Sequence, residues 1–357
     1  MAIGAIGYMV VGVDSNGNSA GTLSNSPTGG CQEFLPFISE GFAITKDDVP
    51  DPSITGIWDQ DAVFNGIQRV EGNVSILAHP ILTGYFLRAA FDTNSTYFVT
   101  SIGNGILGVT APVSAGIRAH HFITRNNQFC TGSGSDLPTL SFEIFRGPQG
   151  QGSAFAYYNC AANNLEMTFE AGQPGRVSAD FIGRDHGRVA RRATLTYGRP
   201  EVYIWCSGSV QIGGTWSPIL ESATWRVENA LQGIARLDGR CRGYDLIKRT
   251  DFRRIFVSGT LGFANDLEYE AFIAGSETTY RMTFKGDNDL NGTNTKNTLL
   301  LDAPRVRYNA YPVAVGGPGR VVVNFTAQCL YDNTSNYALQ IFLVNTRISG
   351  YNVNSNG

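Results

Sequence analysis

A glycine-rich stretch of the sequence has the spacing of a nucleotide-binding loop. Gly103–Gly108 matches the pattern G-x-G-x-x-G, in which the glycines let the backbone approach a pyrophosphate. That loop must open a helix and be followed, about 20 positions later, by an acidic residue. The sequence shows neither feature after Gly108. We therefore predict a glycine-rich hairpin turn rather than a nucleotide site.

An acidic stretch has the spacing of half a calcium loop. Asp287–Gly292 places carboxylate and amide side chains at the alternating positions with which an EF-hand loop begins. The twelfth position of such a loop carries a bidentate Glu, whereas this sequence has Thr298. Because the flanking pattern is that of strands, we expect no calcium site here.

The remaining candidates for chemistry are the four histidines, His79, His120, His121 and His186. The adjacent pair His120-His121 would project to opposite faces of a strand, so it does not converge on one metal ion. The sequence contains no nucleophile elbow, no paired-carboxylate signature and no Cys/His constellation. We predict that the protein is not an enzyme and has no catalytic residue, no cofactor and no metal site.

The composition favours a turn-rich β protein. A chain of 357 residues fits two domains of roughly 160–195 residues each. Glycine is abundant, with 42 residues, and only 16% of the residues are charged, which suits neither a helical nor a disordered protein. The net charge of −3 excludes a bulk nucleic-acid binder.

The cysteines and the N-terminus indicate a protein made in the cytosol. No C-x-x-C spacing or signal-peptide pattern is present, and no apolar run approaches the length of about 20 residues that spans a bilayer. We expect no membrane contact and reduced, buried thiols. The six cysteines are Cys31, Cys130, Cys160, Cys206, Cys241 and Cys329.

One turn sequence occurs twice, and it is the strongest sign of organisation. Ala171–Val177 (AGQPGRV) returns 144 residues later as Val315–Val321 (VGGPGRV), each time before a strand pattern. Pro presets one turn angle, the flanking Gly residues allow positive φ, and the β-branched Val starts the outgoing strand. Two such turns in matching context indicate an internal duplication.

Other landmarks recur in the same order. Each copy has a strand with a central glycine (Gly72, Gly259) that leads into a short helix pattern. These glycines are 187 residues apart, so the first copy carries an insertion, placed at about 93–137, that forms an extra hairpin or an outward-facing elaboration. We predict a first domain at 1–195 and a second at 196–357. The other matched segments are Phe34–Glu40 with Trp216–Glu221, Tyr8–Val11 with Val202–Trp205, and Pro80–Phe91 with Asp266–Ala274.

These patterns predict an all-β fold with one short helix in each repeat. Phe34–Thr45 is expected to form one strand, 46–62 a long polar loop, and Arg184–Arg192 a basic connector. The duplication predicts two tandem domains of this kind.

Two corresponding loops carry opposite charge. Segment 46–62 has a net charge of −4 and segment 229–254 a net charge of +4. Either the two loops drifted apart after duplication, or they dock onto one another between subunits or stacked layers. The candidate stacking residues are Asp47, Asp48, Asp51, Asp59, Asp61, Arg236, Arg240, Arg242, Lys248, Arg249, Arg253 and Arg254.

With these landmarks the chain resembles the major tail tube proteins of long-tailed bacteriophages, in a duplicated-domain form. The resemblance is carried by Phe34–Glu40, the acidic loop, the strands around Gly72 and Gly259, and a closing segment, Ala303–Ala327. It implies a β-sandwich-like domain with a flanking helix. Each domain would add about four strands to a continuous β-barrel, and a duplicated chain would close the ring as a pseudo-hexameric homotrimer.

The resemblance also implies partners and a location. Stacked rings would hold the tape-measure protein and conduct DNA during ejection, without specific binding. Further partners would be the tail terminator and the distal tail or baseplate proteins, in a virion assembled in the bacterial host cytoplasm. The alternative is a duplicated β-sandwich binding module, such as a virion decoration or carbohydrate-binding protein.

Overall fold

The fold is almost entirely β. Strands make up 61% of the structure and helices 8%, which confirms the predicted fold class. The computed structural model describes residues 7–14, 33–53, 59, 62–91, 93–98 (backbone only), 117–124, 137–147, 152–192, 201–217, 219–235, 243–263, 267–290, 295–313, 320–347 and 351.

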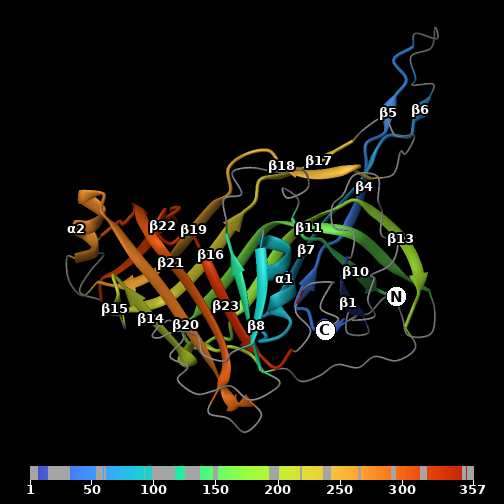
Figure 1. The fold of residues 1–357 in the computed structure, drawn as a ribbon. Helices are drawn as coiled ribbons and strands as arrows, with labels where there is room; N and C mark the ends of the chain where they lie inside the picture. The colour runs from blue at the N-terminus through green and yellow to red at the C-terminus, as the bar shows by residue number, and fades with distance from the viewer. Residues whose placement is uncertain are drawn as a thin grey trace.

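A wide antiparallel sheet, here called the main sheet, runs through both halves of the chain (Figure 1). Its strands follow the order β3 and β4, β7, β12, β11, β16, β19, β22 and β21. Their bounds are β3 Ser39–Glu40, β4 Ala43–Lys46, β7 Gln68–Leu77, β12 Arg176–Gly183, β11 Ser153–Glu170, β16 Leu220–Glu228, β19 Arg254–Gly262, β22 Val322–Cys329 and β21 Lys296–Ala310.

Two smaller sets of strands form a second layer. In the first half the order is β2, β1, β10, β11 and β13, and in the second half it is β15, β14, β20, β21, β23, β9 and β8. Their bounds are β2 Glu33–Phe34, β1 Tyr8–Val13, β10 Leu140–Phe145, β13 Asp185–Ala190, β15 Thr215–Trp216, β14 Gly208–Ile212, β20 Glu277–Asp289, β23 Gln340–Asn345, β9 Arg118–Ile123 and β8 Thr93–Phe98.

The remaining elements are two helices and two small hairpins. Figure 1 shows the β5–β6 hairpin projecting beyond the main sheet, with β17 and β18 on the same side. Their bounds are α1 Thr83–Ala90, α2 Leu267–Ala274, β5 Val49–Pro50, β6 Val63–Phe64, β17 Leu231–Ile234 and β18 Leu246–Arg249, with a 3₁₀ turn at Trp205–Ser207.

The core lies between the two layers because the main-sheet strands alternate. In β7, Val70, Val74 and Ile76 are buried while Glu71 and Asn73 point to the opposite, exposed face. The long strand β11 joins the layers: its first half pairs with β10 and β13, and its second half pairs with β12 and β16. One continuous cluster of buried side chains results.

The strand pairings of the two halves repeat residue for residue in the main sheet. Phe181 lies opposite Gly72 on β12 and β7, and Phe325 lies opposite Gly259 on β22 and β19. These are the offsets of 144 and 187 residues found in the sequence. The division into domains at 195 and 196 stays a prediction, and we call the two sets of strands the first and the second repeat.

Several expected elements differ from those observed. The basic connector contains a strand, β13, which pairs with β11. The segment 46–62, expected to be a loop, contains strand β5, which pairs with β6 just after the segment ends. The expected strand Phe34–Thr45 is broken into β2, β3 and β4. Tyr8–Val11 corresponds to β14 rather than to Val202–Trp205, because β14 pairs with β20 as β1 pairs with β10.

The insertion after α1 adds strands to the second repeat rather than to the first. Strands β8 and β9 form an antiparallel hairpin, and β9 pairs with β23 near the C-terminus. Thus a segment from the first half of the sequence completes a sheet built mainly from the second half. Residues 99–116 and 125–136, including Gly103–Gly108, lie outside the described residues.

Gly72 gives the first testable prediction. A Cβ at this position would overlap the ring of Phe42, which stacks on Tyr157 at 4.7 Å and on Phe181 at 6.1 Å in the core. Gly72→Ala should therefore lower the free energy of unfolding by about 1–3 kcal/mol. Thermal denaturation followed by circular dichroism measures the effect.

The matched control is Gly41→Ala, because a Cβ there meets its nearest atoms only at 3.9 Å, an ordinary contact. This change should shift stability by less than about 0.5 kcal/mol. Equal melting temperatures for the two variants would contradict the packing argument.

Candidate assembly interface and lumen wall

The exposed face of the main sheet is polar across both repeats. The residues that lie opposite one another on this face are rich in Ser, Thr, Asn and Gln. Among them, the carboxylate of Asp180 accepts hydrogen bonds from Asn73 at 2.8 Å and Asn164 at 2.9 Å. Its Arg and acidic residues are balanced in number. These are Arg69, Arg176, Arg226, Arg254 and Arg307, with Glu71, Glu166, Glu170, Asp180 and Glu228.

The two repeats meet where β11 pairs with β16, a contact here called the joint. Its register runs from Asn164 opposite Glu228 to Glu170 opposite Ser222. Beneath it, the ring of Phe169 stacks on that of Phe284 with centroids 4.0 Å apart. The main sheet therefore continues from one repeat to the next without a break.

The side chain of a buried asparagine, Asn229, hydrogen-bonds residues on both sides of the joint. The amide of Asn229 donates to the carbonyls of Ala90 and Ala162, both at 3.0 Å, and so ties the end of α1 to β11. Its Oδ1 accepts a hydrogen bond from Arg249 at 3.1 Å. Because Asn229 is fully buried, removing its side chain would leave the carbonyls of Ala90 and Ala162 without these donors.

The helix α1 is buried at the joint. The C-terminal part of the chain covers it: Tyr351 packs edge-on against Tyr85 at 5.3 Å, and the guanidinium of Arg347 lies 4.9 Å from the Tyr85 ring. Arg347 also forms an ion pair with Glu33 on β2 at 2.7 Å. All eight residues of α1 are buried as a result.

The main sheet stays open within one chain. Strands β3 and β4 lie at one edge. At the other edge β21 pairs with β20 as far as Arg307, so that in the described residues only its end, Tyr308–Ala310, has β22 as its single partner strand, and the described strands close no barrel. Most of the exposed large apolar side chains in the described residues gather near these two ends. They are Ile38, Ile44, Val49, Val63 and Phe64 at the first end, and Trp216, Leu267, Tyr269, Ile273, Val313 and Val322 at the second.

The predicted acidic stacking residues lie along the β5–β6 hairpin and its base. Asp47 pairs with Arg69 and Asp48 pairs with Lys46 at 2.9 Å, which are local contacts. The carboxylate of Asp51 accepts from Ser53, which lowers the pKa of Asp51, and Asp59 is exposed. Asp61 lies outside the described residues.

The predicted basic stacking residues divide into two groups. Arg249 points toward its own chain, where it donates hydrogen bonds to Asn229. Lys248 and Arg254 are exposed, and Arg254 forms an ion pair with Asp251 at 3.2 Å. Arg253 is half-buried. Arg236, Arg240 and Arg242 lie outside the described residues.

The β17–β18 hairpin lies on the first repeat instead of projecting freely. Leu246 and Ile247 are buried, and Asp245 lies 4.0 Å from the buried guanidinium of Arg184, next to β12. Burial raises the pKa of Tyr244, whose charged neighbours include Arg69 and Asp47 at the base of the other hairpin. The structure therefore brings the bases of the two charged segments together, on one side of the main sheet.

The two adjacent histidines of β9 make separate side-chain contacts. His120 faces Asn345 and His121 faces Gln340, each at 3.1 Å, and His121 stacks on Phe342. Burial lowers the pKa of His120 to about 4, so this ring is neutral at pH 7. Among the described residues no group of His, Cys, Asp or Glu could hold a metal ion.

Two buried cysteines act as core residues. Burial raises the pKa of the Cys160 and Cys329 thiols, and both are free, as is the exposed Cys206. Cys31, Cys130 and Cys241 lie outside the described residues. No described helix is long and apolar enough to cross a membrane.

A polar sheet face, two open sheet edges and apolar side chains gathered at those edges describe a subunit that assembles with copies of itself. A model of the family described as phage tail tube protein matches residues 10–329. The chain belongs to that family. No curated protein matches the chain.

Family membership makes the chain a structural subunit of a phage tail tube and a component of the virion. It implies self-assembly into a tube together with other tail components. The sequence did not indicate that the apolar residues of α2 and Trp216 are exposed, or that the main sheet has a continuous polar face. The alternation in each strand marks a polar face, but only the structure shows that these faces join into one surface.

Asn229 gives the second prediction. Asn229→Ala removes both donated hydrogen bonds and the acceptor of Arg249, so we expect a loss of about 2–4 kcal/mol in the free energy of unfolding. Chemical denaturation measures it. The control is Asn309→Ala, because Asn309 is exposed on β21 and should change stability by less than about 0.5 kcal/mol. A neutral Asn229→Ala would show that the joint does not depend on this side chain.

Proposed function

We propose that three copies of the chain close a ring with pseudo-sixfold symmetry, and that stacked rings form the tail tube. Each copy would contribute two tandem tail-tube domains. The joint between β11 and β16 carries this proposal, because it shows one repeat continuing the main sheet of the other. The same kind of contact between β21 of one copy and β3–β4 of the next would pair the open edges.

Ring closure removes a hazard that the single chain leaves in place. An unpaired strand edge is a template for uncontrolled association, and closing a sheet on itself abolishes it. Head-to-tail contacts that close give a ring, and contacts left on the ring faces give a filament. The apolar residues at the two open ends would be buried in the ring, which supports the same arrangement.

The polar face of the main sheet would line the lumen. With β3 and β4 counted as one strand, since both pair with β7, each copy has eight main-sheet strands and three copies would supply 24. This number, spaced about 4.8 Å apart and tilted by about 40°, gives a barrel roughly 40–50 Å across. Such a lumen accommodates first the tape-measure protein and then DNA. Since the Arg and acidic residues of this face balance, the wall has no excess of cations to hold phosphates, so DNA would pass without specific binding.

The charged hairpins would make the contacts between rings. The β5–β6 hairpin carries the acidic segment and projects furthest from the main sheet (Figure 1), so it would reach the next ring. Lys248 and Arg253 of the basic segment lie on the same side, so acidic and basic patches would alternate around one ring face. Such alternating charge fixes the register in which the next ring binds. The tail terminator and the distal tail or baseplate proteins would bind the end rings of a tube assembled in the host cytoplasm.

In this proposal the protein does no covalent chemistry. Its action is passive: an edge-free tube holds the tape-measure protein and later conducts DNA. A virion decoration or carbohydrate-binding module is the weaker reading, because the chain belongs to a tail tube family and its exposed apolar residues lie at the two sheet edges rather than around one ligand site.

Electron microscopy of the purified protein tests this function, and a charge reversal tests the stacking contact. Wild-type protein should form stacked rings with a lumen, and discrete globular particles under all conditions would contradict the proposal. Asp47, Asp48 and Asp51 changed together to Lys should give single rings, because the basic segments would then face like charge.

The control reverses acidic residues that lie on the polar face at the joint instead, Glu166→Lys with Glu170→Lys. These changes should leave the stacking of rings intact. Unchanged tube length in the triple variant would exclude the acidic hairpin as a stacking contact, and rescue by acidic substitutions at Lys248 and Arg253 would identify its partner.

A further inference from the structure

We propose that the outer face of α2, with Trp216 beside it, is a docking surface for the β13 side of a second copy of this chain. The proposal rests on the ring described above and assigns its lateral contact to particular residues. The two helices occupy corresponding places in the two repeats, but their surroundings differ completely.

The contrast between α1 and α2 shows that a cover is missing from α2. Every residue of α1 is buried at the joint, whereas no residue of α2 is. Ala271 and Phe272 pack against the core of their own chain, while Ile273 is 66% exposed and Tyr269 is 40% exposed. A face of this kind buries apolar surface only when a neighbour covers it.

A groove beside α2 has a filled counterpart in the first repeat. A cavity of about 390 Å³ lies between α2, represented by Ala271, and the β14–β15 hairpin, represented by Ile212 and Trp216. In the first repeat, Arg347 fills the corresponding space between α1 and β2 by contacting Tyr85 and Glu33. The second repeat therefore keeps open the place that the first repeat has filled.

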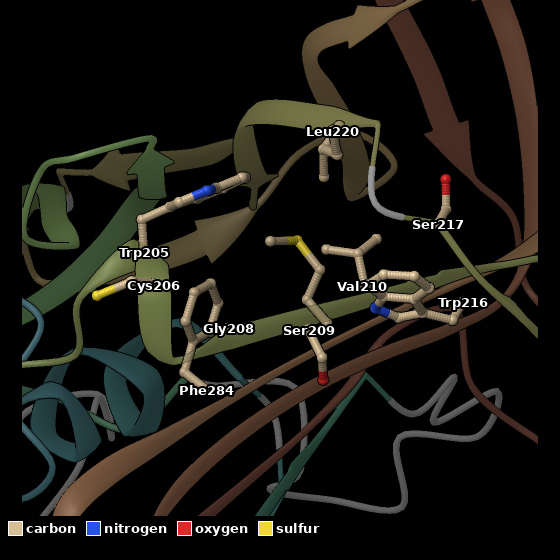
Figure 2. A pocket seen from close by; sticks show the side chains of 10 residues that line it. Trp205, Cys206, Gly208, Ser209, Val210, Trp216, Ser217, Leu220 and Phe284 are labelled. Carbon is tan, nitrogen blue, oxygen red and sulfur yellow. The ribbon is translucent and has the colours of Figure 1, made fainter. Parts of the chain in front are cut away.

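Trp216 stands at the boundary of this groove and a neighbouring one. It is 65% exposed and also lines a cavity of about 260 Å³, where Figure 2 shows it on the opposite side from Trp205. Its counterpart by strand register is Phe34, which pairs with β1 as Trp216 pairs with β14. Phe34 is partly covered, with the guanidinium of Arg192 5.9 Å from its ring.

The occupant is identified by continuity and by charge. Inside the chain, residues that follow β23 cover α1. The strand that corresponds to β23 in the first repeat is β13, since each pairs with the long strand of its own repeat. Figure 1 shows α2 and β13 at opposite ends of the molecule, so a head-to-tail neighbour would bring β13 toward α2.

The charges of the two surfaces are complementary. Helix α2 carries Glu268 and Glu270 in its first turn, with Glu270 exposed. Strand β13 and the residues that follow it carry Arg188, which is exposed, and Arg191. Acidic and basic groups that face each other across a contact set its orientation and rate of formation.

Ile273→Lys tests the docking surface. A basic residue suits the last turn of a helix, so the fold should persist, but the new cation would replace a buried apolar contact and face Arg188 and Arg191. We expect the protein concentration needed for half-maximal ring formation to rise at least about tenfold. Sedimentation velocity measures the rings, and circular dichroism confirms the fold.

The matched control is Glu166→Lys, because Glu166 lies on the polar face of the main sheet, at the joint rather than beside α2. Its rings should form at the wild-type concentration. Ring formation by Ile273→Lys at the wild-type concentration would overturn the proposal.

A charge exchange tests the occupant. Glu270→Arg should weaken ring formation, and the added change Arg188→Glu should restore it. If the double variant assembles no better than Glu270→Arg alone, the β13 side of a second copy is not what covers α2, and the proposal is wrong. Failure of the wild-type protein to form any ring would instead refute the proposed function itself.

Discussion

The constraint on which this structure depends is that the backbone groups at a strand edge must find partners. Within the chain the joint satisfies it, because β11 and β16 pair over seven residues and the main sheet runs on from one repeat to the other. Among the described strands the constraint remains unsatisfied at β3–β4 and at the end of β21, Tyr308–Ala310. A tail tube subunit with such edges is complete only when copies of the chain lie side by side.

The distribution of exposed apolar residues agrees with the distribution of unpaired strand edges. Corresponding positions are buried at the joint and exposed at the open ends, as α1 and α2 show, and as Ile44 on edge strand β4 shows against the buried Trp225 on β16. The two repeats have the same strand order, so the difference is one of position along the sheet. In the proposed ring, one chain would therefore display both the finished contact and the two surfaces from which the next contact would form.

The sequence predicted the elements whose signals are local. The first copy of the G-x-P-G-R-V turn, the central glycines Gly72 and Gly259 and the two short helices all depend on turn geometry or periodicity, and the glycine offsets return as the registers of the main sheet. Residues 314–319, in the second copy of the turn, lie outside the described residues. Strand β13 was missed because polar, charged residues can form a strand wherever a partner strand supplies hydrogen bonds. The division of Phe34–Thr45 into β2, β3 and β4 was missed because it depends on which distant strands these segments pair with. The sequence also could not show that Leu246 and Ile247 fold the basic segment onto the first repeat, since their burial depends on contacts with distant residues.

The central claim is that copies join one another as the two repeats join inside the chain. A cryo-electron microscopy reconstruction of the assembled tube, viewed along its axis, tests it most directly. The account predicts threefold symmetry, with β3–β4 of one copy paired to the β21 edge of the next and the polar face of the main sheet around the lumen. A ring in which these edges stay unpaired, or in which the polar face points outward, would contradict it.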